Sequence, residues 1–154
     1  MPNAGKSSLL NKLTSANVRT ANYPFTTLEP NLGVYNGKVI ADVPGLIEGA
    51  STGKGSGIKF LKHFEKVDMI FHCISVESTD VTTEYNTVIN ELKSYNPRLP
   101  EKKSIILLTK TDLVDKKQIE KKVKELKKFN KAILAVSIYD DKSLDELKRL
   151  LIIE

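Results

Sequence analysis

The stretch that decides the fold of this chain is residues 1–10, MPNAGKSSLL. Gly5-Lys6-Ser7 is the end of the pattern G-x-x-x-x-G-K-[ST], in which a tight turn before a helix binds phosphate groups. The backbone N–H groups of such a turn and the N-terminus of the helix face the phosphates. Lys6 would reach the β- and γ-phosphates, and the Ser7 hydroxyl would bind Mg²⁺. The alternative is a Gly-Lys-Ser turn that only opens a helix.

The front of this pattern does not fit within the chain. The pattern needs a glycine five places before Gly5, and normally a buried strand before that glycine, whereas the chain starts four places before Gly5. We therefore expect a sheet without its first central strand, which would lie beside residues 39–42. Four buried aliphatic side chains of such a strand would contribute roughly 6–12 kcal/mol. Because a domain is stable by only about 5–15 kcal/mol, we expect weakened folding and nucleotide binding.

Length and composition indicate one globular domain over residues 1–154. Hydrophobic residues make up 40% of the chain and charged residues 28%, as in ordinary globular proteins. No apolar run approaches the ~20 residues that cross a bilayer, and no signal peptide is visible. The single cysteine excludes an internal disulfide. We therefore expect a cytoplasmic protein, not a membrane or disulfide-rich secreted one.

Apolar runs alternate with helical periods along the chain. The runs are typical of strands buried on both faces, as in a parallel sheet, and comprise residues 39–41, 69–74, 105–108 and 132–136. Apolar residues recur at helical spacing within residues 85–95, 119–129 and 144–151. Asn36-Gly37 predicts a two-residue hairpin and hence one antiparallel pair. The pattern predicts an α/β domain whose mostly parallel sheet has helices on both faces.

Two further motifs follow buried strands. The first is Asp42-Val43-Pro44-Gly45, which places a carboxylate at the carboxyl end of a strand, where open α/β sheets bind ligands. Asp42 could hold Mg²⁺ through water, and the Gly45 N–H could sense a γ-phosphate. A plain turn after a strand is the alternative interpretation.

The second motif is Thr109-Lys110-Thr111-Asp112, which resembles the guanine-recognition pattern [NT]-K-x-D. A carboxylate there can accept hydrogen bonds from the ring N–H and the exocyclic amine of guanine. Adenine has neither donor at those positions, so it would leave the carboxylate unpaired at a high cost. Ser137-Ile138-Tyr139 follows the last apolar run, where a backbone N–H could reach the guanine carbonyl. The alternative for the T-K-x-D segment is the capped start of a helix.

The order of these segments predicts a P-loop G domain that binds guanine nucleotides. At this point the sequence resembles the Obg family of GTPases. The similarity runs through PNAGKS at residues 2–7, YPFTTLEPNLG at 23–33, DVPGLIEGA at 42–50 and FLKH at 60–63. It covers nearly the whole chain.

The resemblance implies GTP and GDP as ligands, with Mg²⁺ as cofactor. Thr27 would meet Mg²⁺ and the γ-phosphate, so the implied metal ligands are Ser7, Thr27 and Asp42, and the implied catalytic residues are Lys6, Thr27 and Gly45. Leu46 stands where Ras-type proteins carry a water-orienting glutamine, which implies slow hydrolysis. Asn3 matches the asparagine that helps a potassium ion sit near the phosphates. The remaining implied nucleotide-binding residues are Pro2, Ala4, Gly5, Ser8, Phe25, Thr26, Leu28, Glu29, Val43, Pro44, Thr109, Lys110, Thr111, Asp112, Ser137, Ile138 and Tyr139.

The family's partner is the large ribosomal subunit, which implies a role in its assembly and a contact with ribosomal RNA. Family members place a glycine-rich domain before the G domain and many add a C-terminal domain, and we expect both to be absent here. We expect a monomer that makes no membrane contact. A truncated remnant with weak nucleotide binding and no catalysis is an alternative.

Eight lysines lie between residues 116 and 131. They are compatible with a basic RNA-binding module, whose RNA binding would be sensitive to salt and indifferent to nucleotide. A solvated helix face with interspersed glutamates is the simpler interpretation.

Overall fold

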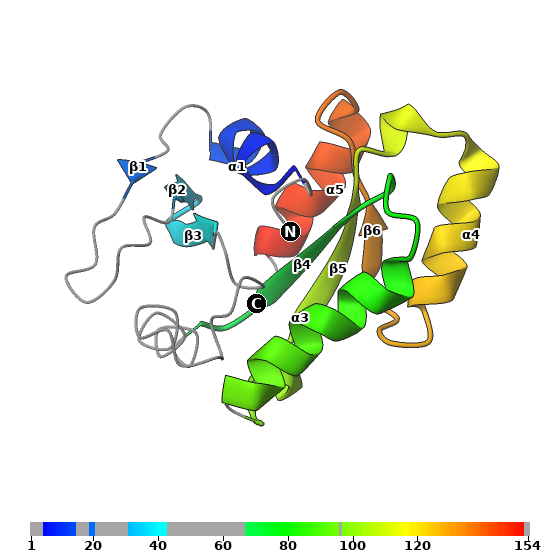
Figure 1. The fold of residues 1–154 in the computed structure, drawn as a ribbon. Helices are drawn as coiled ribbons and strands as arrows, with labels where there is room; N and C mark the ends of the chain where they lie inside the picture. The colour runs from blue at the N-terminus through cyan, green and yellow to red at the C-terminus, as the bar shows by residue number, and fades with distance from the viewer. Residues whose placement is uncertain (1–4, 15–18, 21–30, 43–66, 96, 153–154) are drawn as a thin grey trace.

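The structure is a computed structural model that describes residues 5–14, 19–20, 31–42, 67–95 and 97–152 (Figure 1). Among these residues, no helix has the length and apolar character that a membrane span requires. The elements in chain order are α1 (Lys6–Thr14), β1 (Arg19–Thr20), β2 (Asn31–Tyr35), β3 (Lys38–Asp42), β4 (Ile70–Ser75), α3 (Val81–Tyr95), η2 (Leu99–Glu101), β5 (Ser104–Thr109), η3 (Thr111–Leu113), α4 (Lys116–Leu126), β6 (Ile133–Ala135) and α5 (Asp141–Ile152).

Strands β4, β5 and β6 form a parallel sheet with β5 in the middle. Successive side chains of β5 enter different cores, because side chains alternate between the faces of a strand. Ile105 and Leu107 pack with apolar residues of α1 and α5, whereas Ile106 and Leu108 pack with residues of α3 and α4. Figure 1 shows these helix pairs on opposite sides of the sheet. The predicted α/β layering, with helices on both faces, is confirmed.

Side-chain caps fix where the helices on one face begin. Asp80 precedes α3 and accepts a hydrogen bond from the Thr83 N–H at 3.0 Å. Asp115 precedes α4 and accepts one from the Gln118 N–H at 2.9 Å. Each aspartate satisfies one of the N–H groups that a helix start leaves without an intrahelical partner. The caps therefore start α3 and α4 shortly after β4 and β5 end.

Strands β1, β2 and β3 form a separate antiparallel sheet. The predicted hairpin joins β2 to β3, and its two turn residues have positive φ angles, 51° at Asn36 and 79° at Gly37. A two-residue turn of this kind matches the twist of the paired strands. The antiparallel pair expected from Asn36-Gly37 is confirmed. Among the described residues β3 and β4 are each the last strand of their sheet and do not pair.

The expectation that residues 39–41 are buried on both faces is wrong. Val39 is 68% exposed and Ala41 is also exposed, while Ile40 packs against the core that α1 and α5 share. Strand β3 therefore has one apolar face and one open face, as antiparallel sheets commonly do. The sequence could not reveal the exposed face, because residues 39–41 are all apolar and so do not alternate between polar and apolar side chains.

Helix α1 packs closely on β2 at Gly33. A Cβ atom added to Gly33 would overlap the side chain of Thr14, whose Cγ2 is the nearest atom. The Thr14 hydroxyl donates a hydrogen bond of 2.8 Å to the Leu10 carbonyl, so this side chain is held in place. The absence of a side chain at position 33 thus sets how near the first helix approaches the hairpin.

We expect Gly33→Ala to lower the free energy of unfolding by about 1–3 kcal/mol, the usual cost of overpacking. Val34→Ala is the matched control, because Val34 is the next residue of β2 and is half exposed on the other face. Urea denaturation followed by circular dichroism measures both. Equal, small effects of the two substitutions would contradict the close packing of α1 on β2.

His72 of β4 is buried beneath α3. Its ring stacks on Tyr85 at 5.0 Å between centroids, and Tyr85 stacks on Phe129 at 4.5 Å. Burial lowers the pKa of His72 to about 4, because the charged imidazolium loses its hydration. The folded protein therefore holds this imidazole neutral well below the pH at which an unfolded chain takes up the proton.

The free energy of unfolding should fall as the pH drops below the unfolded pKa of about 6.5. Between about pH 7.5 and about pH 5, His72 should lower the free energy of unfolding by about 2 kcal/mol, because only the unfolded state binds the proton. We expect His72→Phe, which keeps an aromatic ring beside Tyr85, to remove this part of the pH dependence. Urea denaturation at both pH values tests it, and an unchanged pH dependence in the variant would rule it out.

Candidate nucleotide-binding site

The end of the first loop lies against the end of β5. Gly5 has a φ of +77°, and its carbonyl accepts the Leu9 N–H at 3.0 Å in the first turn of α1. The position of a Cβ atom on Gly5 lies 3.6 Å from Lys110 Cε and 3.9 Å from Lys110 Cγ. The aliphatic stem of Lys110 therefore covers Gly5. Two motifs far apart in the sequence meet at one place.

The turn after β5 has an unusual backbone. Lys110 has a φ of 59° and a ψ of 36°, a left-handed conformation that is uncommon outside glycine. Its carbonyl accepts the Leu113 N–H at 3.0 Å, and the Thr111 N–H donates to the Val136 carbonyl at 3.4 Å. This geometry turns the chain sharply out of the strand and directs Asp112 toward the segment that follows β6. Backbone strain of this kind is concentrated at functional sites.

Asp112 is held by Ser137. The Ser137 hydroxyl donates to Asp112 Oδ1 at 2.8 Å and accepts the Tyr139 N–H at 3.1 Å. Ser137 is 3% exposed, and its own N–H donates to the hydroxyl of the buried Ser143 at 3.1 Å. Asp112 itself is exposed, and its Oδ2 accepts no hydrogen bond from any described residue. The carboxylate is thus oriented through one oxygen and open through the other.

The segment after β6 also offers one backbone donor. The N–H groups of Ser137 and Tyr139 are used by the two serine hydroxyls. Within the described chain the Ile138 N–H has no hydrogen-bond acceptor. Its side chain packs against the core shared by α1 and α5. Of the three residues predicted here, Ile138 is therefore the one whose N–H can meet a ligand carbonyl.

Two residues of this site escaped the sequence prediction. Glu77 follows β4 and forms an ion pair of 3.1 Å with the Lys110 ammonium group, while the Ser75 hydroxyl accepts the Glu77 N–H at 3.1 Å. Ser143, at the start of α5, is the other. Glu77 could have been found, because it follows a buried strand as Asp112 does. Ser143 carries no such signal, since its role depends on how α5 returns to β6.

The structure brings together the turn predicted to recognise guanine, the segment 137–139 and Gly5. Lys6 is half exposed at the start of α1, and Ser8 is exposed. Ser7 and Asp42 belong to α1 and β3, but their side chains lie outside the described structure. No three described His, Cys, Asp or Glu residues form a metal-binding group. The other predicted site residues lie outside the described residues: Pro2, Asn3, Ala4, Phe25, Thr26, Thr27, Leu28, Glu29, Val43, Pro44 and Gly45.

Solved structures share this fold. An S. thermophilus NFeoB mutant bound to GDP is 20% identical with a TM-score of 0.71, and covers 96% of this chain and 57% of its own. The G domain of the T. maritima FeoB iron transporter is 24% identical with a TM-score of 0.65, and covers 98% of this chain and 91% of its own. At these identities the likeness establishes the fold alone.

Sequence comparisons identify the family. "GTPase Obg" of Borrelia garinii is 48% identical over 95% of this chain and 46% of its own length. "GTPase Obg" of Rickettsia felis is 46% identical over 97% of this chain and 47% of its own. The chain thus spans about half the length of these relatives, and the resemblance to Obg GTPases is confirmed. A family model described as "50S ribosome-binding GTPase" matches residues 1–110. Because this match covers most of the chain, and the site lies where the strand ends meet the phosphate-loop helix, the chain belongs to the 50S ribosome-binding GTPase family.

Proposed function

We propose that this chain binds GTP and GDP and hydrolyses GTP slowly to GDP and phosphate. The observation that carries the proposal is the arrangement of four residues. Asp112 is oriented by Ser137 at 2.8 Å, and the Lys110 stem lies over Gly5. One end of this arrangement suits a guanine base, and the other is the end of a phosphate-binding loop.

Guanine recognition would use the open side of Asp112. The Asp112 carboxylate can accept hydrogen bonds from the ring N–H and the exocyclic amine of guanine, while Oδ1 also keeps its hydrogen bond from Ser137, because each carboxylate oxygen has more than one lone pair. The Ile138 N–H can donate to the guanine carbonyl, and the Lys110 stem can lie along the base. In the same orientation adenine has no donor facing the carboxylate, and it has an amine where guanine has the carbonyl that faces the Ile138 N–H. Discrimination against adenine would therefore be strong, as in other sites that recognise a ligand by hydrogen bonds.

The phosphate end of the proposal rests on the Obg resemblance. Lys6 would contact the β- and γ-phosphates, and the Gly45 N–H would contact the γ-phosphate. Mg²⁺ would be held by Ser7, Thr27 and Asp42, and would neutralise charge that develops on the phosphates. A potassium ion near Asn3 would add to this neutralisation of the phosphate charge. A leucine at position 46 cannot orient a water molecule, so we propose slow hydrolysis.

The proposed cellular role is in the assembly of the large ribosomal subunit, in the cytoplasm. It is supported by the description of the matching family model and by the Obg relatives. The chain would act as one domain over residues 1–154 and as a monomer. A remnant that binds nucleotide weakly and does not hydrolyse it is the alternative, and it is favoured by the lack of pairing between β3 and β4 in the described structure.

Isothermal calorimetry with Mg²⁺ tests the proposal first. We expect GDP to bind with a dissociation constant on the order of micromolar, while ADP neither binds nor competes, because Asp112 rejects adenine. Phosphate release from GTP then separates a slow GTPase from a remnant. The absence of measurable GDP binding would overturn the proposed function, and binding without hydrolysis would support the remnant.

Asp112→Asn should weaken GDP binding at least about a hundredfold. An amide at this position places a donor opposite the donors of guanine and leaves polar groups unpaired. Asp145→Asn is the matched control, because Asp145 is an exposed carboxylate on α5 and the charge change is the same. If both variants bind GDP like the native chain, Asp112 does not recognise the base.

Ser137→Ala should weaken GDP binding by roughly ten- to a hundredfold. The substitution removes a hydrogen bond to a charged group, worth about 1.5–3 kcal/mol, and frees Asp112 to rotate. Ser94→Ala on the exposed face of α3 serves as the control. Calorimetry measures the affinity and circular dichroism confirms the fold. Unchanged affinity would mean that Ser137 does not position the carboxylate for GDP.

A further inference from the structure

The positive charge of this chain is concentrated in one segment. Residues 116–131 contain eight lysines and two glutamates, a net charge of +6, whereas the whole chain has 24 basic and 19 acidic residues and a net charge of +5. The rest of the chain therefore has 16 basic and 17 acidic residues and is close to neutral. Helix α4 occupies most of this segment. Five of the eight lysines and both glutamates belong to α4, and the other three lysines follow it within residues 127–131, so the charge is concentrated in α4 and the residues after it.

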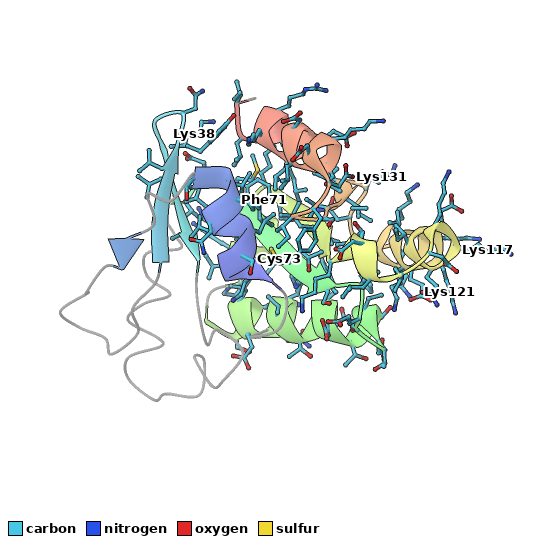
Figure 2. All side chains as sticks on the ribbon, turned by 90° about the horizontal axis from the view of Figure 1, so that it is seen from above. Lys38, Phe71, Cys73, Lys117, Lys121 and Lys131 are labelled. Atoms are coloured by element: carbon cyan, nitrogen blue, oxygen red, sulfur yellow. The ribbon has the colours of Figure 1, made fainter. Side chains whose placement is uncertain are left out.

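Three lysines lie along the outer face of α4. Ile119, Val123 and Leu126 turn inward and pack in the core beneath α3 and α4. Lys117, Lys121 and Lys124, which we call the lysine stripe, follow at i, i+4 and i+7 on the opposite side and are all exposed. Side chains at these spacings lie on one face, about 6 Å apart per four residues along the axis. Figure 2 shows Lys117 and Lys121 at the edge of the molecule, away from the strands.

Two glutamates of α4, Glu120 and Glu125, lie three or four residues from the lysines of the stripe without forming an ion pair with them. None of its three ammonium groups forms an ion pair or hydrogen bond with a described residue. Lys122, by contrast, is turned inward and donates to the Ser78 carbonyl at 2.6 Å. Like charges three and four residues apart destabilise a helix by about 0.2–0.5 kcal/mol per pair. An external polyanion would relieve this repulsion.

We propose that the lysine stripe binds the phosphate backbone of RNA. Lysine contacts phosphate as a point charge, and this face of α4 presents no aromatic side chain to stack on bases and no arginine to read them. The binding would therefore follow the backbone and not the base sequence. The proposal rests on the proposed function in one respect, because ribosomal RNA is the RNA that a ribosome-binding GTPase meets.

Two other polyanionic partners fit the surface less well. A helix that binds a membrane surface exposes apolar residues beside its lysines, whereas the apolar residues of α4 pack inward. Protein interfaces are depleted in lysine and enriched in arginine and aromatic residues, and the stripe has the reverse composition. RNA is the partner that requires charge alone.

The test compares two triple variants in binding to a fluorescein-labelled RNA duplex by anisotropy over a series of salt concentrations. The first is Lys117→Gln/Lys121→Gln/Lys124→Gln. The matched control is Lys93→Gln/Lys103→Gln/Lys142→Gln, which changes three exposed lysines outside α4. Each variant lowers the net charge from +5 to +2. Glutamine keeps a high helix propensity, so α4 should still form.

A plot of log K against log salt concentration has a negative slope, and we expect its magnitude to be smaller by about 2 to 3 in the stripe variant. This is the change expected if each of the three lysines makes one phosphate contact. The control should keep the native slope. Equal losses in both variants, or no loss in the stripe variant, would overturn the proposal. The proposal would also be overturned if the native chain bound phosphatidylserine vesicles or polyglutamate with the same affinity as RNA and the stripe variant lost that binding.

GDP affinity separates this inference from the proposed function. The stripe lies outside the nucleotide-binding residues, so we expect the stripe variant to bind GDP like the native chain. If the native chain binds no GDP but its RNA binding still depends on the stripe, the proposed function fails and the inference stands. If GDP binding is normal and RNA binding ignores the stripe, the inference fails alone.

Discussion

The burial of β5 on both faces is the constraint on which the rest of the structure depends. Its four central aliphatic side chains, Ile105 to Leu108, are at most 6% exposed, and their burial is worth roughly 6–12 kcal/mol. This fixes the strand between two helical layers, so that its carboxyl end is rigid. The turn that we propose for guanine recognition, Lys110 to Asp112, begins where this burial ends. A loosely packed strand could not hold a carboxylate in a defined direction.

The polar site continues from this constraint. The left-handed backbone of Lys110 turns the chain sharply out of β5 within one residue. The turn then carries Asp112 to Ser137, where a 2.8 Å hydrogen bond fixes its orientation. The Lys110 side chain, tethered to Glu77, covers Gly5. Backbone geometry at one residue thus couples the strand, the Asp112 carboxylate and the turn at Gly5.

The two faces of α4 are divided between stability and charge. Its inner residues complete the core that β5 requires, and Asp115 caps its first turn. Its outer face carries the exposed Lys117, Lys121 and Lys124, which are not part of that core. Because exposed lysines contribute little to stability, this face is free to serve binding. The same helix can therefore support the nucleotide site from within and present a cationic surface outside.

The sequence by itself determined the parallel strands, the helices α3, α4 and α5, and the hairpin at Asn36-Gly37, because periodicity and turn chemistry are local properties. It also placed Asp112 and Ser137 at strand ends. Only the tertiary structure decided that Ser137 holds Asp112, that Lys110 covers Gly5 and that Glu77 and Ser143 support them, because these contacts join segments distant along the chain. The exposure of Val39 was likewise decided there, since burial depends on what packs against a strand and not on its own residues.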